Sequence, residues 1–178
     1  MLFLIAYSRC AHAVAGTAAL ILPTLARLIF AGVFLHYFWA SALTKLNGPF
    51  AVADGCYGQI FPRAFEAAGF DATAMPSFQY LVVLFGAWAE ILPPFAIVIG
   101  LFTRLAALGM IRFITLQSLT DIFGRMVGPE TIGAWFNTAS NELIANQRAF
   151  WMLTLVLLVV KAAGPLSADR ALRQWVSG

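Results

Sequence analysis

GAWAEILPPFAIVIGLFTRLAALG, at residues 86–109, is the stretch that decides the fold of this chain. It is apolar on both sides of a short break at residues 101–103, so it predicts two hydrophobic helices that fold back on each other as an antiparallel hairpin. The first half contains one carboxylate, Glu90, while Arg104 opens the second half and Arg112 lies two turns further on. An ionisable side chain inside a lipid-spanning helix is expensive, so each of these residues is a candidate for function or for pairing.

The composition of the whole chain is that of a membrane protein. Of its 178 residues, 61% are hydrophobic and only 11% are charged, and the mean hydropathy is +0.84. A soluble domain carries about 25% charged residues, and several apolar runs reach the roughly 20 residues that a bilayer-spanning helix needs. We therefore predict an all-α, integral membrane four-helix bundle with short interfacial helices, forming a single domain over residues 1–178.

The apolar runs place the four spans at about residues 20–45, 78–102, 103–126 and 149–166. Residues 1–18 are apolar but broken by polar side chains, and we expect an interfacial segment there, before the first span. FPRAFEAAG at residues 61–69 predicts a short amphipathic helix between the first two spans, and Ser167 is an N-cap signal for another near the C-terminus.

The cations orient these spans across the membrane. With four spans, one side receives Arg9, Arg27, Arg104, Lys161, Arg170 and Arg173. The other side receives Lys45, Arg63, Arg125 and Arg148. The positive-inside rule places the first group in the cytoplasm, so we expect both termini there. The formal net charge of +3 is scattered along the chain, which argues against nucleic acid as a partner.

Three ionisable residues are expected at one depth. At 1.5 Å per residue, Glu90 lies roughly 18 Å and Arg112 roughly 15 Å from the turn of the hairpin. Both are then close to the middle of a hydrocarbon core about 30 Å thick, and His36 lies halfway along the first span. We therefore predict a Glu90–Arg112 ion pair, next to a helix kinked by Pro93 and Pro94. A second ion pair, Asp121–Arg125, is expected from the four-residue spacing.

Several motifs of the chain form a recognisable pattern. The first span carries Arg27, Leu28, Gly32 and Phe34 and closes with Ser41 and Lys45. The hairpin carries Ala89-Glu90-Ile-Leu and then Gly100-Leu-Phe-Thr103-Arg104-Leu-Ala-Ala107, and the chain ends with Gly164-Pro-Leu-Ser-Ala-Asp169. Over about residues 22–172 this pattern resembles the DoxX family of small four-helix bacterial membrane proteins. Ala42 departs from it, since a Gly often precedes the Lys in the family, and the loop before the last span is longer than usual.

The resemblance implies a role near membrane redox chemistry in the bacterial inner membrane. The family includes a subunit related to thiosulfate:quinone oxidoreductase, and other members accompany soluble oxidoreductases or metal-handling proteins. We therefore expect a membrane subunit that anchors or assists such a partner. The alternatives are a quinone-reactive subunit that couples substrate oxidation to quinone reduction, and a small proton-coupled transporter acting as a homo-oligomer.

The expected site follows from these alternatives. The candidate catalytic residues are Glu90, Arg112 and His36, and the candidate cofactor-binding residues are Trp39, Trp88 and Arg104. In the functional interpretation, Glu90 and His36 exchange protons with a quinone, Arg112 keeps Glu90 ionised, and the two tryptophans flank the ring. In the structural interpretation, the Glu90–Arg112 pair only clamps the kinked helix, and His36 bonds to a neighbouring helix.

The chain offers no electron carrier of its own. It has no flavin motif, no pair of haem ligands and no cysteine cluster, because its two cysteines, Cys10 and Cys56, are far apart in the sequence. No metal site is expected, and quinone is the one cofactor considered. Any redox enzyme that includes this chain therefore needs a partner chain, and whether the chain itself is an enzyme stays open.

Overall fold

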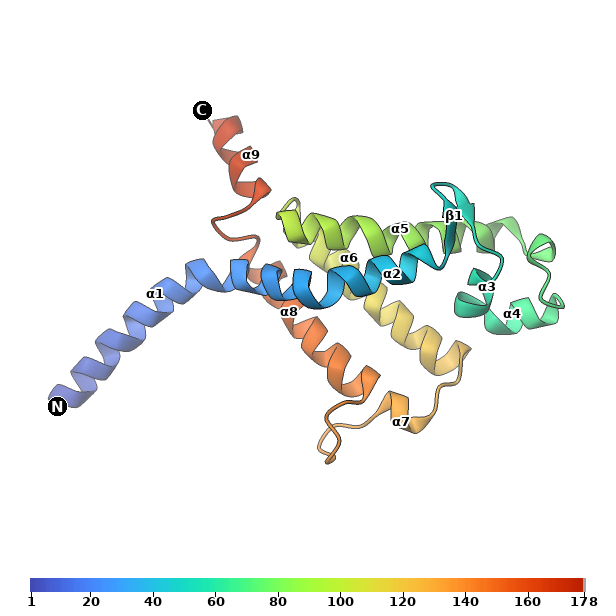
Figure 1. Ribbon diagram of the computed structural model, residues 1–178. Helices are drawn as coiled ribbons and strands as arrows, with labels where there is room; N and C mark the ends of the chain where they lie inside the picture. The colour runs from blue at the N-terminus through green and yellow to red at the C-terminus, as the bar shows by residue number, and fades with distance from the viewer. Residues whose placement is uncertain (178) are drawn as a thin grey trace.

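The computed structural model describes residues 1–177, which are mostly helical and include one short β-hairpin (Figure 1). The longer helices are α1 (Leu2–Phe30), α2 (His36–Leu43), α5 (Ser77–Ile99), α6 (Thr103–Leu119), α8 (Arg148–Lys161) and α9 (Ala168–Ser177). The shorter helices are α3 (Cys56–Ile60), α4 (Pro62–Ala67) and α7 (Pro129–Ile132). The irregular helical turns are η1 (Ala31–Leu35), η2 (Ala72–Ala74), η3 (Thr120–Gly124) and η4 (Leu143–Gln147), and the strands are β1 (Leu46–Gly48) and β2 (Ala51–Val52).

Four helical segments of the described chain are long and apolar enough to cross a membrane. They are Phe3–Leu43, Ser77–Ile99, Thr103–Gly124 and Leu143–Lys161. The predicted all-helical class and the predicted number of such helices are confirmed. The last helix begins before residue 149, the predicted start, because the π-helical turn η4 extends α8 toward its N-terminus.

The first helix is longer than the sequence predicts. α1, η1 and α2 follow one another without a break over Phe3–Leu43, whereas we expected a separate segment over residues 1–18. Ser8, Arg9 and His12 do not interrupt the helix, because such residues lower helix propensity only slightly. The N-terminal part of α1 extends away from the other helices (Figure 1).

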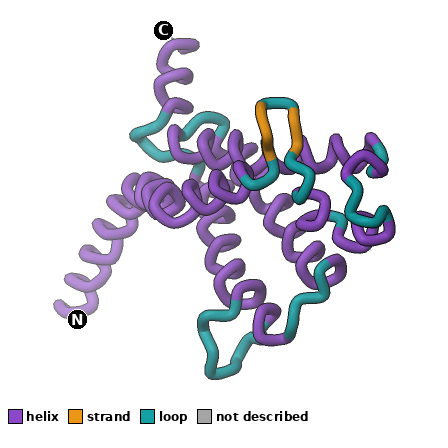
Figure 2. Tube along the Cα trace, turned by 45° about the vertical axis from the view of Figure 1, so that its right-hand side comes forward, coloured by secondary structure: helices purple, strands orange, loops and turns teal. Residues whose placement is uncertain are grey.

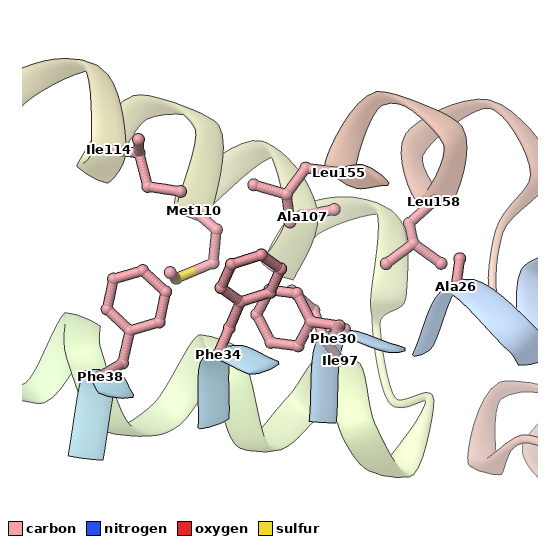
Figure 3. Packing of buried hydrophobic residues seen from close by; sticks show 10 residues of the cluster. All are labelled: Ala26, Phe30, Phe34, Phe38, Ile97, Ala107, Met110, Ile114, Leu155 and Leu158. Atoms are coloured by element: carbon pink, nitrogen blue, oxygen red, sulfur yellow. The ribbon is translucent and has the colours of Figure 1, made fainter. Parts of the chain in front are cut away.

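The four long helices pack around one apolar core. α5 contacts α2 and α6, α6 contacts α8, and α8 contacts α1, so the helices form a closed ring. Phe30, Phe34 and Phe38 repeat every four residues and therefore share one face of the first helix. Figure 3 shows their rings pointing from this helix toward α6 and α8. The buried core residues are Ala26, Phe30, Phe34, Phe38, Ile97, Ala107, Met110, Ile114, Leu155 and Leu158.

The predicted hairpin between α5 and α6 is present, and its turn depends on a glycine. Gly100 ends α5 with φ +74°, in the left-handed region that favours glycine. A Cβ atom on Gly100 would lie 2.6 Å from the Cβ of Ser167 and 2.8 Å from Cζ of Arg27. The turn can therefore lie against both the first helix and the C-terminal segment only because residue 100 lacks a side chain.

Residues 46–76 form a β-hairpin and short helical segments at one end of the bundle, which we name the cap (Figure 2). β1 and β2 pair antiparallel, with Leu46 opposite Val52. The cap has its own apolar centre, in which Cys56, Tyr57 and Phe65 pack against Val83 of α5. The predicted short helix is α4, and it is followed by Gly69 at φ +65°. Both ends of the described chain lie on the side of the bundle away from the cap (Figure 1).

Candidate functional site

Glu90 lies near the middle of α5, and its carboxylate is bound by Lys45. The Lys45 Nζ donates to both carboxylate oxygens of Glu90, at 3.1 and 2.9 Å. The same ammonium group donates to the Ser41 Oγ at 2.6 Å and to the Ser41 carbonyl at 3.1 Å. Lys45 is 6% exposed and Glu90 is 3% exposed, so the ion pair is buried inside the bundle. We refer to Ser41, Lys45 and Glu90 as the Lys45–Glu90 network.

The position of Lys45 follows from the end of α2. The helix ends at Leu43, but a hydrogen bond from the Lys45 N–H to the Ala42 carbonyl continues the helical turn. The Lys45 side chain therefore still lies on the same face as Ser41, four residues earlier. The Lys45 carbonyl accepts a hydrogen bond of 2.9 Å from the N–H of Ala53 in the cap. Lys45 therefore joins α2, α5 and the cap through one residue.

The predicted Glu90–Arg112 ion pair is wrong. Glu90 pairs with Lys45, and Arg112 is exposed on α6. The count of residues from the hairpin turn gave a depth for Arg112 but not the side of the helix. Arg112 lies two residues from Met110 and two from Ile114, which are both buried, so its side chain points to the opposite side, away from the core.

The predicted convergence of His36 with these residues is wrong for the same reason. His36 is exposed and lies two residues from each of the buried Phe34 and Phe38. Figure 3 shows Phe38 and Met110 facing each other across the core, from the first helix and from α6. His36 and Arg112 point away from that core, and so leave the bundle on opposite sides.

The three predicted cofactor-binding residues do not surround a common space. The Trp39 indole donates to the Ile91 carbonyl at 3.3 Å, and the Trp88 indole donates to the Pro49 carbonyl at 2.8 Å. Arg104 is exposed and donates to the Val160 carbonyl at 3.3 Å, at the other end of the bundle. Three cavities, of about 500, 440 and 350 Å³, occur in the described chain, and none of these three is lined by a predicted site residue.

A second buried ion pair, between Asp121 and Arg148, was not predicted from the sequence. Asp121 in η3 accepts from the Arg148 Nη2 at 2.6 Å, and Arg148 also donates to the Ser118 Oγ at 2.9 Å. Arg148 is 3% exposed, although its position before an apolar run placed it at the interface. The predicted Asp121–Arg125 pair is confirmed, at 3.2 Å. No signal in the sequence links Asp121 to Arg148, because their contact depends on how α6 packs against α8.

The cavity of about 500 Å³ opens beside this second pair, between α6 and α8. Polar groups of Thr115, Ser118 and Arg148 line one part of it. The rest of the lining is mainly apolar and includes Trp135 and Met152. A mainly apolar lining with a few polar groups is typical of pockets for small molecules.

Arg27 binds backbone carbonyls of α5 and of the segment that follows α8, at the end of the bundle away from the cap. Its Nε donates to the Ile97 carbonyl at 2.9 Å, and its Nη2 donates to the Val98 carbonyl. Its Nη1 donates to the carbonyls of Ala163, at 3.0 Å, and Leu166. These carbonyls lie at or beyond the last turns of α5 and α8, where a helix leaves carbonyls short of N–H donors, and the Ile97 carbonyl also accepts from the Gly100 N–H at 3.1 Å. Arg27 therefore acts as a shared C-terminal cap, which we name the Arg27 clamp.

Asp169 completes this end of the bundle. Its carboxylate accepts hydrogen bonds from the N–H groups of Phe102, at 2.7 Å, and Thr103, at 3.1 Å, at the start of α6. A carboxylate at a helix N-terminus is favoured by the helix dipole. The motif residues Arg27, Gly100, Thr103 and Asp169 thus meet in one structural group.

Cys56 is buried in the cap, close to the Lys45–Glu90 network. Its exposure is 0%, and removal of the thiol from water is the main cause that raises its pKa above the ordinary value. Nearby Asp54 raises this pKa further, while Lys45 lowers it. The thiol is therefore a protonated, packed side chain at neutral pH.

Comparisons of the chain with protein-family models, with curated proteins and with solved structures find no match. In residues 1–177, no three His, Cys, Asp or Glu side chains are grouped so that they could hold a metal ion.

Proposed function

We propose that this chain is a multi-pass integral membrane protein of the DoxX type, with both termini in the bacterial cytoplasm. It acts as the membrane subunit of a redox-associated complex, in which it anchors or assists a partner oxidoreductase or metal-handling protein. The family resemblance suggests the redox association. The position of Arg112 supports the need for a partner.

Arg112 lies in the middle of the outward face of α6, and this observation carries the proposal. The rest of that face is apolar and exposed, with exposed fractions from 45 to 69% for Leu105, Leu108, Leu116, Leu119 and Phe123. In a bilayer these side chains face lipid. A charged side chain at that depth costs at least about 3 kcal/mol, and such residues are normally paired or turned inward. A partner helix with a carboxylate at this level would remove most of that cost.

The carboxylate has to come from a different chain. Glu90 and Asp121 are the acidic residues within the four long helices, and both are buried and already paired. The remaining acidic residues lie outside these helices, at Asp54, Glu66, Asp71, Glu130, Glu142 and Asp169. A second copy of this chain therefore has no acidic side chain to place beside Arg112 at mid-membrane depth.

The Lys45–Glu90 network fits a supporting role in this function. Its two charges are opposite, the Lys45 ammonium also donates to Ser41, and the network lines none of the three cavities described above. It fixes the cap to α2 and α5, and so holds a surface in place at one end of the bundle. A fixed surface of this kind is what a membrane subunit needs to hold a partner outside the bilayer.

The cavity of about 500 Å³ favours a second candidate function, a quinone-reactive subunit. Its apolar lining would accept a ring and its tail, and the guanidinium of Arg148 in that lining could donate a hydrogen bond to a quinone oxygen. This places the quinone between α6 and α8 rather than beside Glu90. Extraction of the purified protein should then yield quinone, and Ala149→Trp, which fills the cavity, should abolish it.

The partner is tested by purifying the tagged chain from its native membrane in mild detergent and measuring the mass of the intact complex. We expect a stoichiometric partner chain with a flavin, haem or metal site. Arg112→Leu should release the partner, whereas the matched change Arg104→Leu, at an exposed arginine near the end of the same helix, should not. Purification of a bare monomer, or an unchanged complex with Arg112→Leu, would contradict the proposal.

A further inference from the structure

The cavity of about 350 Å³ lies at the end of the bundle that holds the Arg27 clamp. One wall is apolar and comes from α1, with Ala19, Leu20 and Pro23. The opposite wall comes from the end of α8, the turn after it and the start of α9. This second wall carries three cations, Lys161, Arg170 and Arg173, and one carboxylate, that of Asp169.

The charge of this cavity is positive. The Asp169 carboxylate is turned to the start of α6, where it accepts two backbone hydrogen bonds. Lys161 and Arg170 are exposed, and their long side chains can reach a group placed in the cavity. With three cations and one anion, the lining keeps a net positive charge that would attract an oxyanion.

The turn between α8 and α9 fixes the walls against each other. Gly164 has φ +77°, and a Cβ atom there would lie 2.9 Å from the Thr24 Oγ1 and 3.1 Å from the Pro23 Cβ. The Ser167 Oγ accepts the Arg170 N–H at 3.3 Å, which caps α9 and sets the direction of its first turn. The cationic wall is therefore held beside α1 by the close approach of the Gly164 backbone to Pro23 and Thr24.

The place of the cavity is that of a membrane interface. Lys161 is the last residue of the fourth long helix, so it marks where that helix leaves the bilayer. α9 runs crosswise to α5 in both views (Figures 1 and 2), as a helix lying on a membrane surface would. Leu172, Trp175 and Val176 form its apolar side and are 44, 82 and 78% exposed. A helix with such a side and with arginines opposite is typical of binding in the headgroup region.

We propose that this cavity binds the phosphate of an anionic phospholipid, with the headgroup among Lys161, Arg170 and Arg173 and an acyl chain along α1. The apolar wall is the reason for choosing a lipid over a free oxyanion, because inorganic phosphate gains nothing from Leu20 and Pro23. This inference rests on the proposed membrane insertion but not on the proposed partner chain.

The test uses the purified full chain in detergent, to which one lipid is added at a time. Phosphatidylglycerol and phosphatidylcholine with the same acyl chains are compared, and inorganic phosphate is the third probe. Native mass spectrometry counts the bound lipid, and the midpoint of thermal unfolding reports its stabilising effect. We expect one phosphatidylglycerol per chain, held about tenfold more tightly than phosphatidylcholine, because each nearby cation favours an anionic lipid.

Variants then assign the binding to the cavity. The triple variant Lys161→Gln, Arg170→Gln, Arg173→Gln should lose the preference for phosphatidylglycerol. The control variant Arg9→Gln, Arg63→Gln, Arg125→Gln removes the same charge elsewhere and should keep it. If the first triple variant does not fold, Arg170→Gln alone should still weaken binding severalfold.

Three results would overturn the proposal. The first is equal retention of the two lipids by the unaltered chain. The second is an unchanged preference in the cavity variants. The third is stabilisation by inorganic phosphate equal to that by phosphatidylglycerol, which would make the cavity a site for a free oxyanion. Loss of the partner chain from the native complex would leave all three measurements unaffected.

Discussion

The ammonium group of Lys45 donates hydrogen bonds to both carboxylate oxygens of Glu90, 45 residues later in the chain, at 3.1 and 2.9 Å. Both side chains are buried, so each charge depends on the other for the interactions that water would otherwise provide. The pair links the end of the first long helix to the middle of the second.

Removal of one partner from the Lys45–Glu90 pair should destabilise the protein strongly. Glu90→Gln or Lys45→Met leaves a buried charge without its counter-ion, so each should lower the free energy of unfolding by about 3 kcal/mol. The double variant should lose clearly less than the sum of the two. Reversible unfolding in detergent micelles measures all four proteins, and strictly additive losses would show that the two residues act independently.

Glycine is required at position 100 and not at position 109. Gly100→Ala would force a Cβ atom to within 2.6 Å of Ser167 and 2.8 Å of Arg27, at a φ of +74°. It should destabilise the fold by about 2 kcal/mol or more, because both strain and overpacking act there. Gly109→Ala is the matched control, since its Cβ atom would meet nothing within 4 Å, and in a helix it should be neutral or stabilising by about 0.5–1 kcal/mol. The unfolding midpoints of the two variants should therefore move in opposite directions or differ widely.

The two arginines that bind Asp121 should differ in importance. The Arg148 side chain is 3% exposed, whereas that of Arg125 is 53% exposed. Asp121→Asn leaves the buried guanidinium of Arg148 without a counter-ion and should lower the free energy of unfolding by about 3 kcal/mol. Arg125→Gln removes an exposed partner and should cost less than about 1 kcal/mol. Equal losses in the two variants would mean that burial does not decide the strength of these contacts.

The two cysteines should differ in their reaction with a maleimide. Cys10 is exposed, whereas Cys56 is buried and its pKa is raised chiefly by burial. Less thiolate is present at a given pH when the pKa is raised, so Cys56 should stay unlabelled at pH 7. It should react only at a pH well above the ordinary pKa of a cysteine, or after unfolding. Mass spectrometry of Cys10→Ser and Cys56→Ser, labelled in detergent, measures each thiol alone. Rapid labelling of Cys56 in the folded Cys10→Ser variant would show that the cap opens.

The sequence predicted where the helices lie better than which side of each helix faces the core. The turn at residues 101–103, the short helix α4 and the N-cap at Ser167 all followed from local signals, and the structure contains each of them. The faces did not follow, because the outward stripe of α6, with Leu105 and Leu116, is as apolar as the core stripe with Met110. In a lipid-facing helix, apolarity does not separate inside from outside.

One signal in the sequence does point to the partner of Glu90. Lys45 follows Ser41 by four residues and shares a helical face with Arg27. This spacing is compatible with a Lys45 side chain that points into the bundle. Its place at the end of a span suggested an interfacial cation instead. The Asp121–Arg148 contact has no such signal, because the two residues are joined by a long loop whose path the sequence does not predict.

The Arg27 clamp restricts the order in which this protein can fold during its synthesis. The first long helix leaves the ribosome with a guanidinium whose acceptors, at Ile97, Val98, Ala163 and Leu166, have yet to be translated. Ile97 and Val98 can accept from Arg27 first, but the Arg27 Nη1 has neither of its acceptors until residues 163–166 emerge. The bundle can therefore close fully only at a late step, and a ribosome stalled before residue 163 would leave Arg27 with two of its four acceptors, Ile97 and Val98.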